Sequence, residues 1–205
     1  MPIKHRKKET SYAEFLLFID ALHEYAEHST RSNKQVFKDI ETLLWLMYYT
    51  GARIAEILAV NATDWDKEKH LLHINKSVGA TSQATRQIIT TKTPQSVRDI
   101  PLTDQAEMVL ADLVSRSHSE PLLASPDGLP YEIDYISNII ANISRASGIT
   151  FNAYMLRHLF STELFRAGTD PAVIRDLMGH TSRSMSLDYA KSSFADRTEA
   201  IRRRK

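Results

Sequence analysis

Residues 70–102, HLLHINKSVGATSQATRQIITTKTPQSVRDIPL, decide the fold class, because the spacing of the apolar residues changes here. Three short segments, 70–78, 85–91 and 97–102, are rich in β-branched residues and bounded by turn residues, as is typical of strands. Residues 93–96, TPQS, have the composition of a hairpin tip. The stretch therefore predicts a small three-stranded antiparallel sheet.

On the N-terminal side of this insert, apolar residues recur with a helical period. Ser11 and Glu14 have the spacing of a capping box, and a helix with one apolar face is expected to follow them. A second helix is expected from about Ser32 to Gly51, since glycine tolerates the left-handed conformation that ends a helix. A third, short helix is expected over residues 53–60.

The chain returns to a helical period after the insert. Helices are expected over residues 104–117, 132–147, 152–167, 171–178 and about 182–190, with a terminal helix after Phe194. Asp170 followed by Pro171 is a typical helix start, and Gly168 and Gly179 are typical stops. The pattern predicts a mainly α-helical fold with a three-stranded β insert, an α+β fold, which alone specifies no function.

Composition narrows the class of protein. The chain has 205 residues, 42% of them hydrophobic, with 6 glycines and 7 prolines, and is expected to form one globular domain or two small lobes. It contains no cysteine, which excludes disulfides and thiolate metal sites. The longest apolar run, residues 43–49, is far shorter than the ~20 residues of a membrane span. We expect a soluble, cytoplasmic protein without a membrane partner.

Charge is informative through its distribution. The net charge is +1, but basic residues gather at both ends of the chain, over residues 4–8 and 202–205. Such ends are either simply solvated or contact phosphates, and the sequence leaves both possibilities open.

Two short segments before and within the insert carry candidate functional cations. Arg53 follows a glycine stop and stands three residues before Glu56, a spacing that most often means an intrahelical ion pair. Lys92 is placed where a strand enters the hairpin tip, and a lysine there is usually a solvated charge that discourages edge pairing.

Two further segments near the C-terminus are ordinary when taken singly. Tyr154 and Arg157 lie three apart and are expected at the polar rim of an amphipathic helix. His180 follows the Gly179 stop and can simply satisfy helix carbonyls, and Tyr189 comes nine residues later.

Together and in this order, these segments resemble the tyrosine recombinases, the family of phage integrases and chromosome-resolving recombinases. The resemblance covers nearly the whole chain and rests on the strings TGARIAEIL, TKTPQSVRDIPL, YMLRHLFSTELFRAG and LMGHTSRSMSLDYA. The related type IB topoisomerases share similar chemistry, but LRH and MGH favour the recombinases. The resemblance implies the fold of the recombinase catalytic domain and double-stranded DNA as the partner.

The same resemblance implies site-specific recombination through a 3′-phosphotyrosine intermediate. Tyr189 would be the nucleophile, and Lys92 would protonate the leaving 5′ oxygen. Arg53 and Arg157 would clamp the non-bridging phosphate oxygens, to which His180 would add a hydrogen bond. No metal or other cofactor is implied, because these cations supply the positive charge.

Two residues need separate comment. Glu56 is expected to support the site by orienting Arg53. Tyr154 stands where the family's H-x-x-R motif has histidine, and a phenol with a pKa near ~10 is a poor proton carrier at neutral pH. We expect Tyr154 to donate a hydrogen bond to phosphate; His158 is not expected to replace the missing imidazole, because one helical residue turns a side chain by about 100°.

The resemblance also sets expectations for domains and assembly. Residues 1–205 are expected to be a single catalytic domain, with a basic N-terminal segment (1–10), a C-terminal tail helix (191–205) and no N-terminal core-binding domain. The protein is expected to be a tetramer on DNA and a monomer or weak oligomer alone. The tail helix could dock on its own domain or on a neighbouring subunit.

The resemblance leaves the biological role partly open. Integration and excision of a mobile element is favoured over resolution of chromosome dimers. The alternative to an enzyme is a catalytically weakened, recombinase-like DNA-binding module. It is suggested by Tyr154, which stands where the family's motif has histidine.

Overall fold

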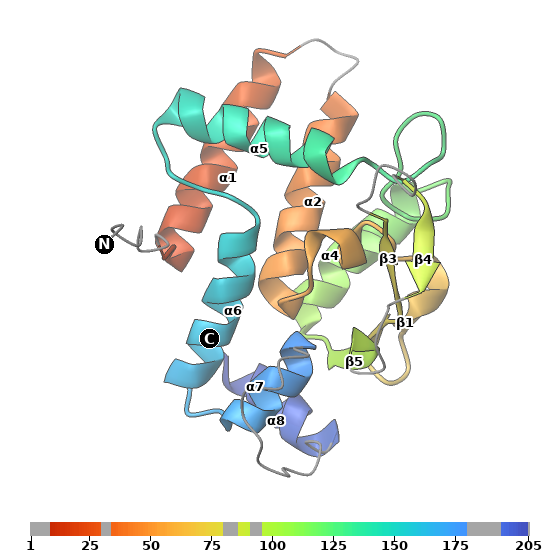
Figure 1. The fold of residues 1–205 in the computed structure, drawn as a ribbon, viewed down its shortest axis with the longest axis vertical. Coiled ribbons are helices and arrows are strands. Elements are labelled where there is room, and N and C mark those ends of the chain that lie inside the picture. The colour runs from red at the N-terminus through yellow and green to blue at the C-terminus, as the bar shows by residue number, and fades with distance from the viewer. Residues whose placement is uncertain (1–8, 30–33, 80–85, 91–95, 180–193, 205) are drawn as a thin grey trace, which may run out of the picture.

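The computed structural model describes residues 9–29, 34–79, 86–90, 96–179 and 194–204. Its helices are α1 (Tyr12–Glu27), α2 (Lys34–Thr50), α3 (Ile54–Ile57), α4 (Asp104–Arg116), α5 (Ile133–Ser147), α6 (Tyr154–Arg166), α7 (Pro171–Met178) and α8 (Phe194–Arg203). Its strands are β1 (Trp65–Asp66), β2 (Leu71–Ile74), β3 (Lys76–Val78), β4 (Ile88–Thr90) and β5 (Arg98–Pro101). Helices dominate, with a small antiparallel sheet on one side, which confirms the predicted fold class (Figure 1).

The predicted start of the first helix is confirmed in detail. The Ser11 hydroxyl accepts a hydrogen bond from the Glu14 backbone N–H at 3.2 Å, and the Glu14 carboxylate accepts one from the Ser11 N–H at 2.9 Å. Each side chain thus satisfies a backbone donor that a helix N-terminus leaves unpaired. Helix α1 then packs against α2 and α5.

Strand pairing differs from the simple three-stranded expectation. The predicted strand over 70–78 is divided at Asn75: β2 pairs with β1 and β5 in one sheet, whereas β3 pairs with β4 in a second. Just after the division, Lys76 donates to the buried carboxylate of Asp64 at 2.6 Å. The chain changes sheets where a buried ion pair, rather than an apolar residue, fixes its position.

Other predicted elements are shorter or lie outside the described residues. The third helix ends at Ile57 rather than Val60, because Ala59 and Val60 donate to carbonyls only three residues back, as in a tight turn. Most of the predicted hairpin tip and the predicted helix over 182–190 fall outside the described ranges.

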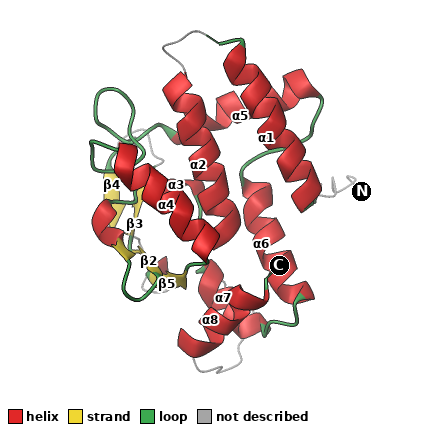
Figure 2. Cartoon of the chain, turned by 180° about the vertical axis from the view of Figure 1, so that it is seen from behind, coloured by secondary structure: helices red, strands yellow, loops and turns green. Residues whose placement is uncertain are grey.

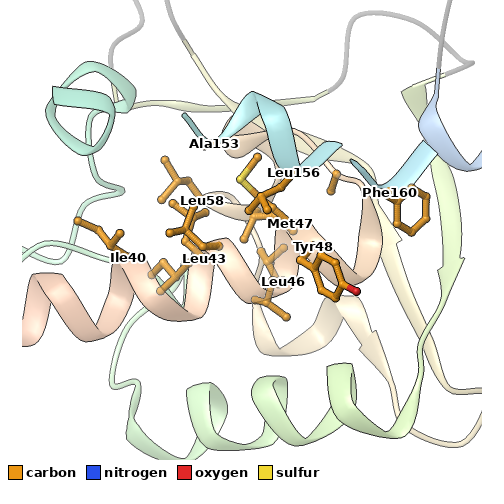
Figure 3. Close-up of a cluster of buried hydrophobic side chains, with 14 of the residues drawn as sticks. Ile40, Leu43, Leu46, Met47, Tyr48, Leu58, Ala153, Leu156 and Phe160 are labelled. Carbon is orange, nitrogen blue, oxygen red and sulfur yellow. The ribbon is translucent and has the colours of Figure 1, made fainter. Parts of the chain in front are cut away.

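The core is built around α2, which packs against α1, α4 and α6. Met47 and Tyr48 of α2 meet Leu156 and Phe160 of α6, and all four side chains are buried (Figure 3). The predicted stop at Gly51 is confirmed, with φ at +63°. A Cβ atom there would lie 2.4 Å from the Phe160 ring, so the close approach of α6 requires glycine.

Helices α7 and α8 lie together at the end of the molecule below α6 (Figure 2). The Asp170 side chain caps α7 by accepting from the Ala172 N–H at 2.6 Å, and Gly179 ends the helix with φ at +60°, as predicted. Ala200 and Ile201 of α8 are buried. The described part of the C-terminal tail therefore docks on its own domain. None of the helices in the described ranges is long and apolar enough to cross a bilayer.

Candidate active site

The site begins where α2 ends and α3 starts. Gly51 reverses the chain, and Arg53 takes the position preceding α3 in extended conformation. Its backbone N–H donates to Oε2 of Glu56 at 2.7 Å, and its Nη1 donates to Oε1 of the same carboxylate at 2.7 Å. The side chain of Arg53 is 39% exposed, so it is anchored by Glu56 and still reaches solvent.

Glu56 is buried between two arginines. Arg98 of β5 donates from Nη2 to Oε2 at 2.8 Å and from Nη1 to Oε1 at 3.1 Å, which makes a two-pronged ion pair. Burial by itself would raise the pKa of Glu56, but the hydrogen bonds and charges of Arg98 and Arg53 outweigh burial and lower the pKa to about 2. Glu56 is therefore ionised at neutral pH.

Arg157 lies on α6 with only 2% of its surface exposed. Its Nη1 donates to the Gly51 carbonyl at 2.5 Å, and its Nη2 donates to the Met178 carbonyl. Burial lowers the pKa of this guanidinium to about 10, with a further contribution from the charges of Arg53 and Arg98. The expectation of a rim position was wrong, because the carbonyls of two chain turns hold this polar group inside the domain.

Three arginines from three elements meet at the end of α7. Arg98 Nε donates to the Leu177 carbonyl at 2.7 Å, Arg157 to the Met178 carbonyl, and Arg53 Nη2 to the Gly179 carbonyl at 3.1 Å. Successive carbonyls at a helix C-terminus lack helical partners and carry the negative end of the helix dipole. We call Arg53, Arg98, Arg157 and the carbonyls of residues 177–179 the arginine clamp.

The arginine clamp has an excess of positive charge. Three guanidiniums meet here with one carboxylate, that of Glu56, which pairs with Arg53 and Arg98, while Arg157 binds only neutral carbonyls. A preorganised cluster of this kind stabilises an anion that arrives from solvent, above all a phosphate, two of whose oxygens can be bound by the fork of one guanidinium. Arg53 is the member of the clamp that is exposed enough to touch such an anion directly.

Tyr154 is the first residue of α6, and 59% of its surface is exposed. It stands three residues before Arg157 on the same helix, which places the phenol within one helical turn of the clamp. His158 is also exposed but lies 3.8 Å from the carboxylate of Glu9 and 3.4 Å from the Thr162 hydroxyl. The structure gives His158 partners at the surface, in agreement with leaving it out of the predicted site.

The other predicted site residues, Lys92, His180 and Tyr189, lie outside the described residues. In the sequence, His180 directly follows Gly179, the last residue of the clamp. No group of three or more His, Asp or Glu side chains suited to a metal ion occurs within the described ranges.

Arg98 is a member of the clamp that was not singled out from the sequence. The signal was present in VRDIPL, where Arg98 has the same strand phase as Ile100. Both residues are buried, as alternation within a half-buried strand requires. A charged residue in the apolar phase of a strand indicates a buried partner, here Glu56.

The chain matches known proteins over most of its length. A sequence model described as the phage integrase family matches residues 17–196. The chain is similar to the tyrosine recombinase XerC of Roseiflexus sp. (strain RS-1), with 26% identity over 79% of this chain and 50% of the relative. It is also similar to transposase A from transposon Tn554 of Staphylococcus aureus, with 29% identity over 71% of this chain and 41% of the relative.

The fold is also similar to those of solved structures. The Tn1549 transposon integrase in complex with transposon right end DNA has a TM-score of 0.71 at 19% identity, over 98% of this chain and 67% of that chain. The XerA recombinase has a TM-score of 0.63 at 17% identity, over 89% of this chain and 58% of that chain. The present chain spans half or less of the length of the two curated relatives above.

Proposed function

Because the chain belongs to the phage integrase family, we propose that it is the catalytic domain of a tyrosine-type site-specific DNA recombinase. The observation that carries this proposal is the arginine clamp. Arg53 and Arg157, predicted to bind the same phosphate, bind neighbouring carbonyls at the end of α7, immediately before His180 and ten residues before Tyr189.

The reaction is a pair of transesterifications at phosphorus. In the first, the Tyr189 phenol loses its proton to solvent and its oxygen attacks phosphorus, while the bond from phosphorus to the 5′ oxygen breaks. The 3′-phosphotyrosyl link keeps the energy of the broken phosphodiester, and in the second step a 5′ hydroxyl attacks phosphorus and displaces the tyrosine. Lys92 gives a proton to the departing 5′ oxygen. Negative charge accumulates on the non-bridging oxygens in the transition state, where the guanidiniums and the His180 imidazole stabilise it.

The two arginines have different parts in the proposed reaction, and the difference in their burial supports this. Arg53 is partly exposed, so in this proposal its guanidinium binds a phosphate oxygen directly. Arg157 is buried and fixed by two carbonyls, so it acts first as a fixed positive charge beneath the phosphate. Glu56 orients Arg53, and Tyr154 donates a hydrogen bond to the phosphate from the exposed rim.

The partner and the setting are parts of the same proposal. The substrate is double-stranded DNA, on which four copies assemble, and the reaction serves integration or excision of a mobile element in the cytoplasm. Two proteins similar to this chain are named as parts of transposons, which favours a mobile element. The chain by itself should bind DNA with a strong dependence on salt, because contacts to phosphates dominate such binding.

The experiment is capture of the covalent intermediate on a nicked duplex. Cleavage beside the nick releases a short fragment that diffuses away, so the protein remains attached to DNA. A recombinase gives an adduct that survives denaturing electrophoresis and is lost in Tyr189→Phe. A DNA-binding module, the second candidate suggested by Tyr154, gives a mobility shift without an adduct. Absence of both would refute the proposal.

Tyr154 has its own test in the same assay. If this phenol donates a hydrogen bond in the transition state, Tyr154→Phe should slow adduct formation about 10–100-fold while leaving DNA affinity nearly unchanged. An unchanged rate would remove Tyr154 from the mechanism but leave the other assignments in place.

A further inference from the structure

We propose that Arg98 is a positioning residue for strand cleavage, holding Arg53 and the end of α7 in one fixed arrangement. The inference rests on the proposed function, since it names a further residue on which the same site depends. Arg98 does not touch the substrate in this assignment. It acts through Glu56 on one side and through the Leu177 carbonyl, near the end of α7, on the other.

The contacts of Arg98 connect Glu56, which binds Arg53, to the end of α7. Its Nη1 and Nη2 hold both oxygens of Glu56, at 3.1 and 2.8 Å, while its Nε holds the Leu177 carbonyl at 2.7 Å. Nη1 also donates to the Ser96 carbonyl at 3.0 Å. All three nitrogens of one planar group are therefore engaged, and a planar group fixes the angles between its partners as well as their distances.

Arg53 depends on this arrangement because it shares a carboxylate oxygen with Arg98. Glu56 Oε1 accepts from Arg53 Nη1 at 2.7 Å and from Arg98 Nη1 at 3.1 Å. Arg53 is itself 39% exposed, so the orientation of its guanidinium is set by Glu56 more than by packing. Without Arg98, the buried Glu56 loses two of its donors, and Arg53 loses the fixed partner that aims it.

The end of α7 depends on Arg98 through close contact as well as hydrogen bonding. Gly179 has φ at +60°, and a Cβ atom there would lie 2.8 Å from Arg98 Nη1. The guanidinium thus packs directly on the bare backbone of Gly179 while it binds the Leu177 carbonyl. The contact therefore fixes the backbone at Gly179, the residue that precedes the predicted site residue His180 in the sequence.

Burial separates this role from that of a residue that binds substrate. The Arg98 side chain is 2% exposed, against 39% for Arg53. A phosphate that enters from solvent can therefore meet Arg53 but not Arg98. A misplacement of about 1 Å in such a site lowers the rate about 10²-fold, even when the altered residue is away from the reacting atoms.

The test compares buried Arg98 with Arg116, a largely covered, ion-paired arginine, in the full chain. Arg98→Met and Arg98→Lys are assayed beside Arg116→Met, whose arginine is 15% exposed and binds Asp39 at 2.5 Å and Thr42 at 2.7 Å, outside the clamp. Melting temperature is measured for each variant, and all assays are run well below the lowest value. DNA affinity and the rate of covalent adduct formation at saturating nicked DNA are then measured separately.

We expect Arg98→Met to lower the saturating rate about 10²-fold while DNA affinity changes less than about 3-fold. Arg98→Lys should recover part of the rate, because an ammonium can pair with Glu56 but cannot hold a planar set of three acceptors. Arg116→Met should melt at a lower temperature and cleave at the wild-type rate. A wild-type rate in Arg98→Met, or an equal loss in Arg116→Met, would overturn the positioning role.

A second measurement does not depend on activity. Nuclear magnetic resonance of ¹⁵N-arginine observes the guanidinium N–H groups of Arg53 and Arg157. Their hydrogen bonds within the clamp should shift these signals and protect the protons from exchange with water. Both sets of signals should change in Arg98→Met and stay in place in Arg116→Met. If the wild-type chain forms no adduct, the proposed function fails; unchanged signals in Arg98→Met would instead refute the positioning role.

Discussion

Glu56→Gln is expected to alter how the stability of the chain depends on pH. Glu56 is 3% exposed and lies between Arg53 and Arg98, which lower its pKa from the ordinary value of 4.5 to about 2. The folded chain therefore binds a proton at this group less readily than the unfolded chain does. Ionised Glu56 stabilises the fold above about pH 4.5, and this contribution is lost as the pH falls toward 2.

The size of the effect follows from the two pKa values. Their difference of about 2.5, at about 1.4 kcal/mol per pH unit, corresponds to about 3 kcal/mol of unfolding free energy at neutral pH. About two thirds of this amount should be lost by pH 3, which is accessible to experiment. Glutamine removes the negative charge at every pH and leaves the buried guanidiniums without their carboxylate partner. The unfolding free energy of the variant should therefore lack the pH dependence that comes from Glu56.

The assay is urea unfolding of both chains between pH 3 and pH 7. We expect Glu56→Gln to be less stable than wild type by about 3 kcal/mol at pH 7, and by only about 1 kcal/mol at pH 3. Glu199→Gln is the matched control, since Glu199 is 54% exposed in a surface pair with Arg203 and should change stability by less than about 0.5 kcal/mol. A difference between wild type and Glu56→Gln that stays constant with pH would refute the assignment of the charge.

Two further predictions use matched pairs of positions, with unfolding free energy as the measurement. Gly179→Ala should cost about 2–4 kcal/mol, because the backbone there is left-handed and the new Cβ atom would lie 2.8 Å from Arg98 Nη1. Gly148→Ala should cost about 1 kcal/mol, because the backbone there is also left-handed but the space around it is open. Arg204→Ala should cost about 2 kcal/mol, since its guanidinium lies 4.1 and 4.7 Å from two aromatic rings and is ion-paired, whereas Arg203→Ala, at an exposed pair, should cost under about 0.5 kcal/mol. Equal losses within either pair would contradict the stated cause.

The helix boundaries could be predicted because the side chains that set them are local in sequence. Ser11 with Glu14, Asp170 before Pro171, and Gly179 each act within one turn of the helix they begin or end, and each does so in the structure. Strand partners are not local. The division of the predicted strand at Asn75 depends on β5 and on Asp64, and no pattern within residues 70–78 indicates it.

The site residues show the same difference between contacts that are local in sequence and contacts that are not. The spacing of Arg53 and Glu56 predicts their ion pair, and that pair is present at 2.7 Å. The burial of Arg157 was missed because its partners are not side chains: the carbonyls of Gly51 and Met178 could belong to residues of any type. The roles of Lys92, His180 and Tyr189 stay predictions from the resemblance.

Backbone acceptors also explain how a site can depend on positions that carry no chemistry of their own. The carbonyls of residues 177–179 meet three guanidiniums only because α7 ends where it does, and it ends there because Gly179 adopts φ of +60°. Residues of any type at positions 177 and 178 offer the same backbone carbonyl oxygens, provided that the helix ends at the same residue. The glycine therefore sets which carbonyl meets which arginine, and moving the stop by one residue would misalign Arg53, Arg98 and Arg157 together.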